Sequence, residues 1–288
     1  MENIKILAEK MGSYKLIDSG EKEKLEEIGG ERIIRKEPRA WWKKSLAKNE
    51  WRGKKELEKV IDIGIGGIKA KILFKETSKH IGIFPEQIGE WKWIKEKLEN
   101  LREKSENKKE INILNLFGYT GIASLVAAQA GLSKTSEWGV EVTHVDASKQ
   151  SVDWARENQK LSGLENAPIR WIVDDCVKFI RREAKQGKKY DAIIMDPPSF
   201  GHGPKGEVWK IEEKLPELLL ACREILNEKP LFVIFNMYST ELSSVSIANL
   251  LSDMTKGLGG KIECGELAIK QDGSEKLLPM SIFALWER

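Results

Sequence analysis

The chain of 288 residues is 41% hydrophobic and 32% charged, a composition typical of a folded protein with a large core. No apolar run approaches the ~18 residues that span a bilayer, and Met1–Lys10 lacks the apolar segment of a signal peptide, so we expect a cytoplasmic protein. The three cysteines (Cys176, Cys222 and Cys264) and the three histidines are scattered, which argues against a disulfide framework and against a bound metal.

Residues 1–80 read as a β-rich N-terminal region. Strand-like stretches at Tyr14–Ile17, Ile33–Arg35 and Ile61–Phe74 are separated by glycines. Residues 32–59 contain eleven basic and four acidic side chains, together with tryptophans at positions 41, 42 and 51. Cations can bind phosphates while aromatic rings stack on unpaired bases, so this region is a candidate RNA contact. The alternative is a solvated basic face with its tryptophans turned into the core.

Residues 81–288 form the second predicted unit. Apolar residues recur at helical spacing from Glu90 to Arg102, and after residue 110 strand-like and helix-like segments alternate. The predicted strands are Ile111–Leu116, Val140–Val145, Ile169–Val173, Tyr190–Met195, Leu231–Asn236, Ile262–Ile269 and Ser281–Leu285. The predicted helices are Ile122–Ala130, Gln150–Leu161, Val177–Ala184, Leu215–Leu226 and Ser244–Met254. This alternation predicts a Rossmann-like, doubly wound α/β fold with a mostly parallel seven-stranded sheet, whose ligands bind beyond the carboxyl ends of the strands.

Two glycine-rich segments compete for the role of a cofactor loop. Val60–Ile68 is followed by another strand-like segment, although a dinucleotide-type loop should open a helix. We therefore expect a hairpin with a glycine turn there. Ile111–Gly121 runs from a strand through NLFGYTG into a helix of small residues, and Gly118 and Gly121 allow close approach of a ligand to the backbone.

Acidic residues stand where the next three predicted strands end. Asp146-Ala147-Ser148 follows the second strand, and a carboxylate there can accept both hydroxyl groups of a ribose. Asp174-Asp175-Cys176 follows the third strand, and Asp196-Pro197-Pro198-Ser199-Phe200 follows the fourth. Because these segments meet at one edge of a parallel sheet, they predict a single site.

This order of segments resembles the class I S-adenosylmethionine-dependent methyltransferases. HIGIFPEQIGEW (80–91), NLFGYTG (115–121), HVDASKQSVDWARENQKLSGL (144–164), WIVDDCVKF (171–179) and DPPSFGHGPKGEVWKIEE (196–213) are similar to one bacterial branch. That branch contains the large-subunit ribosomal RNA methyltransferases that modify cytosine carbon-5 or guanine N7. We recognise no PUA-type RNA-binding domain, which many relatives carry, and the β-rich region could take its place.

The resemblance implies S-adenosyl-L-methionine as cofactor, RNA as partner, and a role for each matching position. The methionine part of the cofactor would lie against Asn115, Phe117, Gly118, Tyr119, Thr120 and Gly121. The ribose would meet Asp146, followed by Ala147 and Ser148, and the adenine would meet Asp175 and Cys176. Glu86 and Gln87 fall where relatives carry an Asp-Gln pair that reaches the cofactor. Asp196, Pro197, Pro198, Ser199 and Phe200 would form the catalytic loop, in which the prolines fix the backbone so that carbonyls orient an amine and Phe200 stacks on a flipped base.

The positions of the cysteines indicate which atom of the base accepts the methyl group. Methylation at cytosine carbon-5 requires a cysteine nucleophile, but serine stands in the loop after the fourth strand and no cysteine follows the fifth. We therefore favour a base nitrogen, with Ser199, Asn236 and Tyr238 as polar candidates for substrate contacts. Lys205 and Lys210 lie in a long loop that could form a lid.

Other functions remain open from the sequence alone. A methyltransferase for a protein or a small molecule would use the same cofactor site. A non-catalytic RNA-binding module would be expected to have lost part of that site. A nicotinamide dehydrogenase is disfavoured because residues 115–121 lack the G-x-G-x-x-G pattern.

Overall fold

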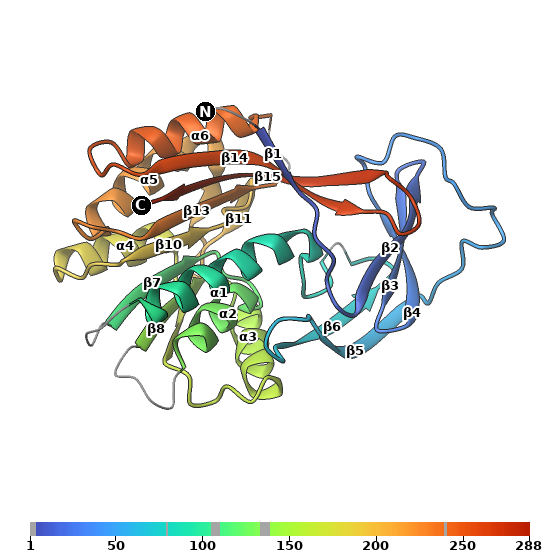
Figure 1. The fold of residues 1–288 in the computed structure, drawn as a ribbon, viewed down its shortest axis with the longest axis horizontal. Helices are drawn as coiled ribbons and strands as arrows, with labels where there is room; N and C mark the ends of the chain where they lie inside the picture. Colours follow the sequence, from blue (N-terminus) through green and yellow to red (C-terminus); the bar gives the residue numbers. More distant parts are fainter. Residues whose placement is uncertain (1–3, 79, 105–109, 133–138, 239–240) are drawn as a thin grey trace.

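The computed structural model describes residues 4–78, 80–104, 110–132, 139–238 and 241–288. Its centre is an eight-stranded sheet with the order β1-β14-β15-β13-β10-β7-β8-β9 (Figure 1). The strands are β1 (Ile4–Leu7), β7 (Glu110–Leu116), β8 (Gly139–Asp146), β9 (Ile169–Val173), β10 (Ala192–Met195), β13 (Phe232–Met237), β14 (Lys261–Lys270) and β15 (Leu277–Glu287). Only β15 runs antiparallel to its neighbours. The predicted mostly parallel sheet is confirmed, and β1 adds an eighth strand to the seven that we predicted.

Helices cover both faces of this sheet. α1 (Ile88–Glu103) and α2 (Ile122–Gly131) pack on one face, with α3 (Lys149–Leu161) beside α2. α4 (Cys176–Lys185), α5 (Ile211–Ile225) and α6 (Ser244–Met254) pack on the other face. Every residue of β10 and β13 is buried, as expected for strands covered on both sides. None of the helices in the described part of the chain is long and apolar enough to cross a membrane.

Strands β2 to β6 form two small sheets that lie beside the eight-stranded sheet and its helices (Figure 1). β2 (Tyr14–Gly20), β3 (Glu23–Ile28) and β4 (Glu31–Lys36) form an antiparallel sheet, and β5 (Glu56–Asp62) pairs with β6 (Lys69–Lys75). Ser19 Oγ donates to Gln271 Oε1 in the connection between β14 and β15 (2.9 Å). Trp154 Nε1 of α3 donates to the carbonyl of Lys71 in β6 (3.1 Å). The division at residue 80 stays a prediction, and these contacts join the two parts.

The hairpin of β5 and β6 shows what the first glycine-rich segment does. Gly64, Gly66 and Gly67 have positive φ, and Ile63 N donates to the carbonyl of Ile68 across the turn (3.1 Å). The expected hairpin with a glycine turn is therefore confirmed.

Candidate active site

A cavity of about 1120 Å³ opens at the carboxyl ends of the central strands. Its walls come from the ends of β7, β8, β10 and β13, from the start of α1, and from β3 and β4 of the N-terminal sheet. The volume exceeds the ~300–1,000 Å³ of a pocket for one drug-sized ligand, so the cavity has room for more than a cofactor. Sixteen predicted site residues line it: Glu86, Gln87, Asn115, Phe117, Gly118, Tyr119, Thr120, Asp146, Ala147, Ser148, Asp175, Cys176, Asp196, Pro198, Asn236 and Tyr238.

The loop between β7 and α2 adopts a strained backbone. Phe117 and Tyr119 have φ of 56° and 50°, and Gly121, the N-cap of α2, has φ of 80°. Left-handed conformations of bulky residues are uncommon and occur often at ligand sites. A Cβ at Gly118 would lie 2.4 Å from Cε1 of the buried His144, so only glycine fits. Glycine at position 118 therefore lets the loop pack directly against His144, while the side chains of Phe117, Tyr119 and Thr120 line the cavity.

A chain of polar side chains supports this loop from below. Asn115 Nδ2 donates to Ser124 Oγ (2.8 Å), which lies 3.0 Å from His144 Nδ1. Burial lowers the pKa of His144 to about 3, so the ring is neutral at physiological pH. Asn115, Ser124 and His144 thereby hold the loop without adding charge.

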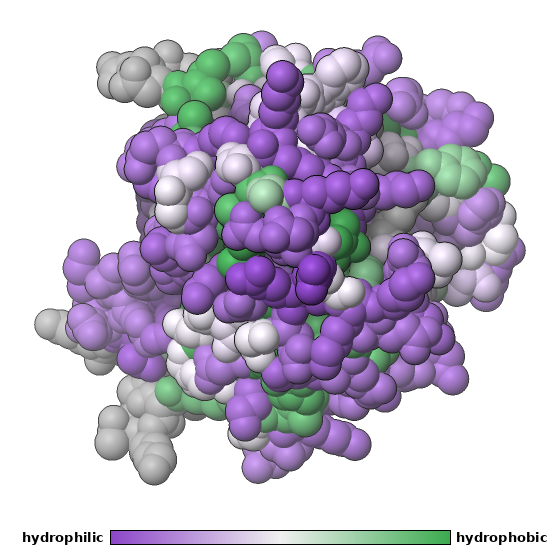
Figure 2. Space-filling model, turned by 90° about the vertical axis from the view of Figure 1, so that its right-hand side faces the viewer, coloured by the Kyte–Doolittle hydropathy of each residue, from purple (hydrophilic) through white to green (hydrophobic). Residues whose placement is uncertain are grey.

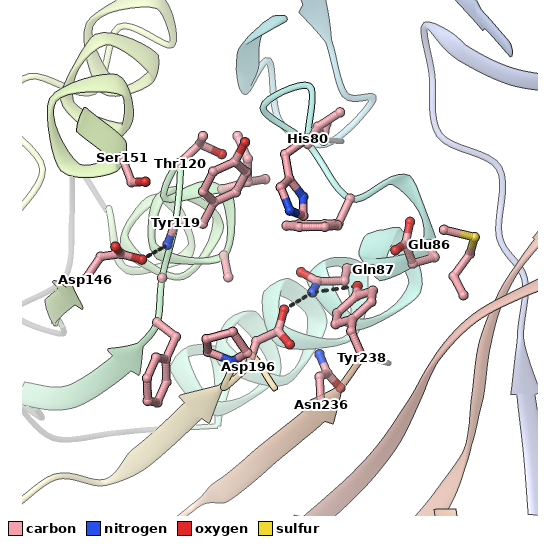
Figure 3. A pocket seen from close by; sticks show the side chains of 18 of the residues that line it. His80, Glu86, Gln87, Tyr119, Thr120, Asp146, Ser151, Asp196, Asn236 and Tyr238 are labelled. Carbon is pink, nitrogen blue, oxygen red and sulfur yellow. Dashed lines mark hydrogen bonds between the residues drawn. The ribbon is translucent and has the colours of Figure 1, made fainter. Parts of the chain in front are cut away.

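Asp146 is fixed at the tip of β8. Its Oδ2 accepts from the backbone N–H of Tyr119 (2.9 Å), and its Oδ1 accepts from that of Ser148 (2.8 Å). The N-cap of α3 is Ser148, whose Oγ accepts from Ser151 N. Burial raises the pKa of Asp146, while the two backbone donors oppose the shift. The carboxyl is therefore held in the cavity wall beside the loop between β7 and α2 (Figure 3).

Asp175 has a structural contact besides its predicted one. Its Oδ1 accepts from Lys178 N and caps α4 (2.9 Å), so the other oxygen is the one left for a ligand. Cys176 is buried beside it, and burial raises the pKa of its thiol.

The segment before α1 is tied directly to the cofactor loop. Gly82 N donates to Tyr119 Oη (3.1 Å), and Thr120 Oγ1 donates to the carbonyl of Gly82 (2.8 Å). A short 3₁₀ turn, Pro85–Gln87, then places Glu86 and Gln87 in the cavity wall. No sequence pattern indicates these bonds of Gly82.

Asp196 sits between the cofactor loop and β13. Gln87 Nε2 donates to Asp196 Oδ2 (2.9 Å) and to Tyr238 Oη (3.2 Å) (Figure 3). Burial raises the pKa of Asp196 to about 7; the Gln87 bond opposes this shift and the nearby Glu86 adds to it. Asp196 Oδ1 has no hydrogen-bond partner in the described part of the chain. The group can therefore take up a proton near neutral pH.

The residues after Asp196 diverge from the cavity. Pro198 lines it, whereas Pro197, Ser199 and Phe200 do not. The carbonyl of Pro198 accepts from Trp209 Nε1 (2.5 Å), so this oxygen already has a donor other than a substrate amine. Phe200 is 56% exposed and starts the hairpin of β11 (Phe200–His202) and β12 (Val208–Lys210).

That hairpin occupies the place of the predicted lid. Lys205, in its turn, is exposed, and Lys210 pairs with Glu213 (3.0 Å). His202 and Trp209 of the hairpin line the cavity, and sequence analysis did not identify either residue.

Glu90 and Asn236 were separate in the sequence but meet in the structure. Asn236 Nδ2, at the end of β13, donates to Glu90 Oε2 on α1 (2.6 Å). Burial raises the pKa of Glu90 to about 8, an effect to which Asp196 and Glu86 contribute and which Asn236 opposes. In the sequence Glu90 only begins a stretch of helical spacing, and no pattern points to this contact.

The N-terminal sheet supplies the basic wall of the cavity. Lys24, Arg35, Lys36 and Arg39 line it. The face that carries this sheet is mostly hydrophilic (Figure 2). Three of these four cations are paired with buried carboxylates: Lys24 with Glu26 and Glu37, Arg35 with Glu26, and Arg39 with Glu37. Most of the positive charge of this wall is therefore already neutralised.

The three tryptophans of this region have different roles. Trp42 Nε1 donates to the carbonyl of Ser19 (2.8 Å), and Trp51 Nε1 donates to Asp18 Oδ2 (3.0 Å). Trp41 is 79% exposed and lies under the ammonium group of Lys22. Two of the rings are therefore fixed within the fold, and Trp41 is left for a partner.

Comparison with known proteins assigns the chain to a family. The family model of S-adenosylmethionine-dependent methyltransferases matches residues 44–232. The chain belongs to this family. A crystal structure of an S-adenosylmethionine-dependent methyltransferase from Agrobacterium tumefaciens is 40% identical, with a TM-score of 0.87 over 98% of this chain and 93% of that one. A methyltransferase from Streptococcus mutans, 17% identical with a TM-score of 0.64 over 96% and 76% of the two chains, shows the fold alone.

The curated relatives are ribosomal RNA methyltransferases. Ribosomal RNA large subunit methyltransferase K/L of Shewanella frigidimarina is 36% identical over 117 residues, which is 40% of this methyltransferase and 15% of the relative. Ribosomal RNA large subunit methyltransferase I of Klebsiella pneumoniae is 36% identical over 111 residues, 38% and 23% of the two chains. This methyltransferase thus spans less than a quarter of the length of either relative.

Proposed function

We propose that this methyltransferase transfers the methyl group of S-adenosylmethionine to a nitrogen of an RNA base, with ribosomal RNA as the first substrate to test. The observation that carries the proposal is Asp196, whose buried carboxyl has a pKa of about 7 and one oxygen without a partner in the described part of the chain. The names of the curated relatives support RNA as the substrate class.

The cavity fits the cofactor along the ends of β7, β8 and β9. In this proposal the loop of residues 117–120 would lie against the methionine part, Asp146 would meet the ribose, and Asp175 and Cys176 would border the adenine; all of these residues line the cavity. Bound S-adenosylmethionine supplies a methyl group activated by its sulfonium. Fixing the two reactants in this cavity can lower the barrier by ~7–11 kcal/mol.

Asp196 accepts the proton that the methylated nitrogen of the base releases. Bound S-adenosylmethionine would give its methyl group to the acceptor nitrogen and leave as the neutral thioether, and an acceptor nitrogen that carries a hydrogen would become cationic and have a proton to release. Asp196 Oδ1 then accepts the proton that the nitrogen releases, while Gln87 holds Oδ2 in place. An ionised Asp196 would also stabilise the positive charge during the transfer.

The cysteines favour nitrogen over cytosine carbon-5. Cys222 and Cys264 are buried and do not line the cavity. Cys176 lines the cavity beside Asp175, at the adenine end, and burial keeps it a thiol. A covalent mechanism would need a thiolate near the methyl group, whereas the carboxyl of Asp196 suits an amine.

The experiment is methyl transfer from radiolabelled S-adenosylmethionine to unmodified ribosomal RNA. The Asp196→Asn variant should bind the cofactor but lose at least 100-fold in rate, the lower end expected for a general base. Asp191→Asn is the matched control, because Asp191 precedes β10 at its opposite end and does not line the cavity. Cofactor binding without transfer to RNA would contradict the proposal and favour a protein or small-molecule acceptor.

A further inference from the structure

The cavity continues past Asp196 into a slot between α1 and β13. Glu90 and Ile94, one turn apart, form the α1 side, and Ile234 and Asn236, on the same face of β13, form the other. This part of the cavity lining therefore combines two apolar side chains with a hydrogen-bonded polar pair. That combination suits a flat, heteroaromatic group.

The polar end of the slot has unused hydrogen-bonding capacity. Although Asn236 Nδ2 donates to Glu90 Oε2, the other oxygens, Glu90 Oε1 and Asn236 Oδ1, are shielded from solvent and have no partner in the described part of the chain. An unsatisfied buried polar group costs ~1–3 kcal/mol and calls for an explanation such as a ligand or an ordered water.

The pair presents one donor and one acceptor. Burial and the neighbouring carboxyls of Asp196 and Glu86 raise the pKa of Glu90 to about 8, so Glu90 is mostly neutral at pH 7. Because Oε2 accepts from Asn236, the proton belongs on Oε1, which becomes a donor. Asn236 Oδ1 stays an acceptor. Proteins use buried neutral carboxyls as hydrogen-bond donors elsewhere.

The strand order places the slot on the substrate side. The cofactor residues stand on β7, β8 and β9, Asp196 stands on the next strand, β10, and Asn236 stands on β13 beyond it. Along this edge of the sheet, the predicted cofactor residues therefore come first, Asp196 comes next, and the slot follows. A target bound in the slot would have its reactive nitrogen beside Asp196.

We propose that Glu90 and Asn236 are specificity-determining residues that bind the hydrogen-bonding edge of the target base. Glu90 Oε1 donates to a ring nitrogen or carbonyl oxygen, and Asn236 Oδ1 accepts from an adjacent N–H of the same base. The ligand class is a nucleobase extruded from its strand. This inference rests on the proposed function, and it adds the residues that select the substrate.

Two variants of Glu90 separate recognition from packing. Glu90→Gln keeps an acceptor for Asn236 and a donor in the place of Oε1, so its kcat/KM for RNA should stay within about threefold of wild type. Glu90→Leu removes both groups, and kcat/KM should fall roughly 5- to 150-fold, because a paired base contact contributes ~1–3 kcal/mol. The affinity for S-adenosylmethionine, measured by calorimetry, should change less than twofold in both variants.

Glu183→Leu is the matched control. Glu183 is a buried glutamate on α4 that accepts from Tyr190 and Arg170 and lies outside the cavity lining. Glu183→Leu should lower the thermal midpoint and leave the KM for RNA unchanged. If Glu90 had only a structural role, Glu90→Leu would give the same result.

Several other outcomes of these experiments would contradict the proposal. Equal loss in Glu90→Gln and Glu90→Leu would overturn the proposed neutral donor. Unchanged kinetics in Glu90→Leu, or a loss of cofactor affinity instead of RNA affinity, would overturn the assignment of the slot to the base. Transfer of the labelled methyl group to a ribose hydroxyl would also overturn the assignment of the slot to the base. Failure of the wild-type enzyme to label any RNA would refute the proposed function and this inference with it.

Discussion

The pH dependence of methyl transfer should follow the ionisation of Asp196. Its pKa of about 7 results from burial in the cavity, so about one molecule in eleven has the carboxylate at pH 6 and about half at pH 7. If the carboxylate is the active form, kcat/KM for S-adenosylmethionine should rise about fivefold between these two values, because this ratio reports the free enzyme. The comparison stops at pH 7 because Glu90, with a pKa of about 8, ionises above it.

Gln87→Leu should move this profile to higher pH. The bond from Gln87 Nε2 to Asp196 Oδ2 (2.9 Å) favours the charged form. A hydrogen bond to a charged group contributes ~1.5–3 kcal/mol, equivalent to a shift of roughly one to two pH units. The assay is initial-rate label transfer at a fixed RNA concentration, in buffers of constant ionic strength. A flat profile from pH 6 to pH 7, or a rise over that range that is no steeper in Gln87→Leu than in the wild-type enzyme, would refute the role assigned to Asp196.

Three further changes test other parts of the structure. Gly118→Ala would place a Cβ 2.4 Å from the buried His144, so cofactor affinity measured by calorimetry should fall at least tenfold, whereas Gly139→Ala, with no atom within 4 Å of the added Cβ, should have no effect. Glu26→Gln should lower the free energy of unfolding at pH 7 by about 3 kcal/mol in urea titrations, since the pKa of this buried carboxyl is held at about 2 instead of 4.5. Trp41→Ala should leave the thermal midpoint unchanged and weaken RNA binding roughly 5- to 150-fold, because stacking on an unpaired base contributes ~1–3 kcal/mol.

Each of these changes has a contrary result. Unchanged cofactor affinity in Gly118→Ala would show that the loop can move away from His144. Since the pKa of Glu26 is lowered in the folded state, its stabilisation should disappear as pH falls from about 4.5 to about 2, and a constant difference from Glu26→Gln over that range would contradict the assignment. An equal loss of RNA binding in Trp41→Ala and in Leu220→Ala, a control on the exposed side of α5, would remove the case for stacking.

The catalytic half of the fold was predictable from hydrophobic pattern. Its central strands are covered on both faces, so they read as short apolar runs separated by helices of clear periodicity. β9 and α6 begin and end at the predicted residues, Ile169–Val173 and Ser244–Met254. Most of the residues that we predicted to contact the cofactor line one cavity, because they stand where strands end and the topology brings strand ends together.

The N-terminal region was not predictable in the same way. β3 has the sequence EKLEEI, which favours a helix by propensity, yet it is the middle strand of its sheet. Glu21 and Lys22 adopt positive φ in the turn before it, and Glu26 is buried by pairing with Arg35 and Tyr14. Tertiary ion pairing therefore overrides local preference, and no local pattern records that pairing.

The slot of Glu90 and Asn236 illustrates the same limit within the site. The two residues are 146 positions apart and meet only through the packing of α1 against the sheet. Likewise, the carbonyl of Pro198 is occupied by Trp209 through a hairpin that the sequence showed only as a long loop. Contacts of this kind depend on the fold and follow from no motif.

The most direct test of the account is mass spectrometry of the nucleosides from ribosomal RNA methylated by the purified enzyme, with Asp196→Asn in parallel. The account predicts one base methylated on nitrogen in the wild-type reaction, absent from the variant reaction. A methyl group on cytosine carbon-5 or on ribose, or an equal yield of N-methylated base with Asp196→Asn, would contradict it.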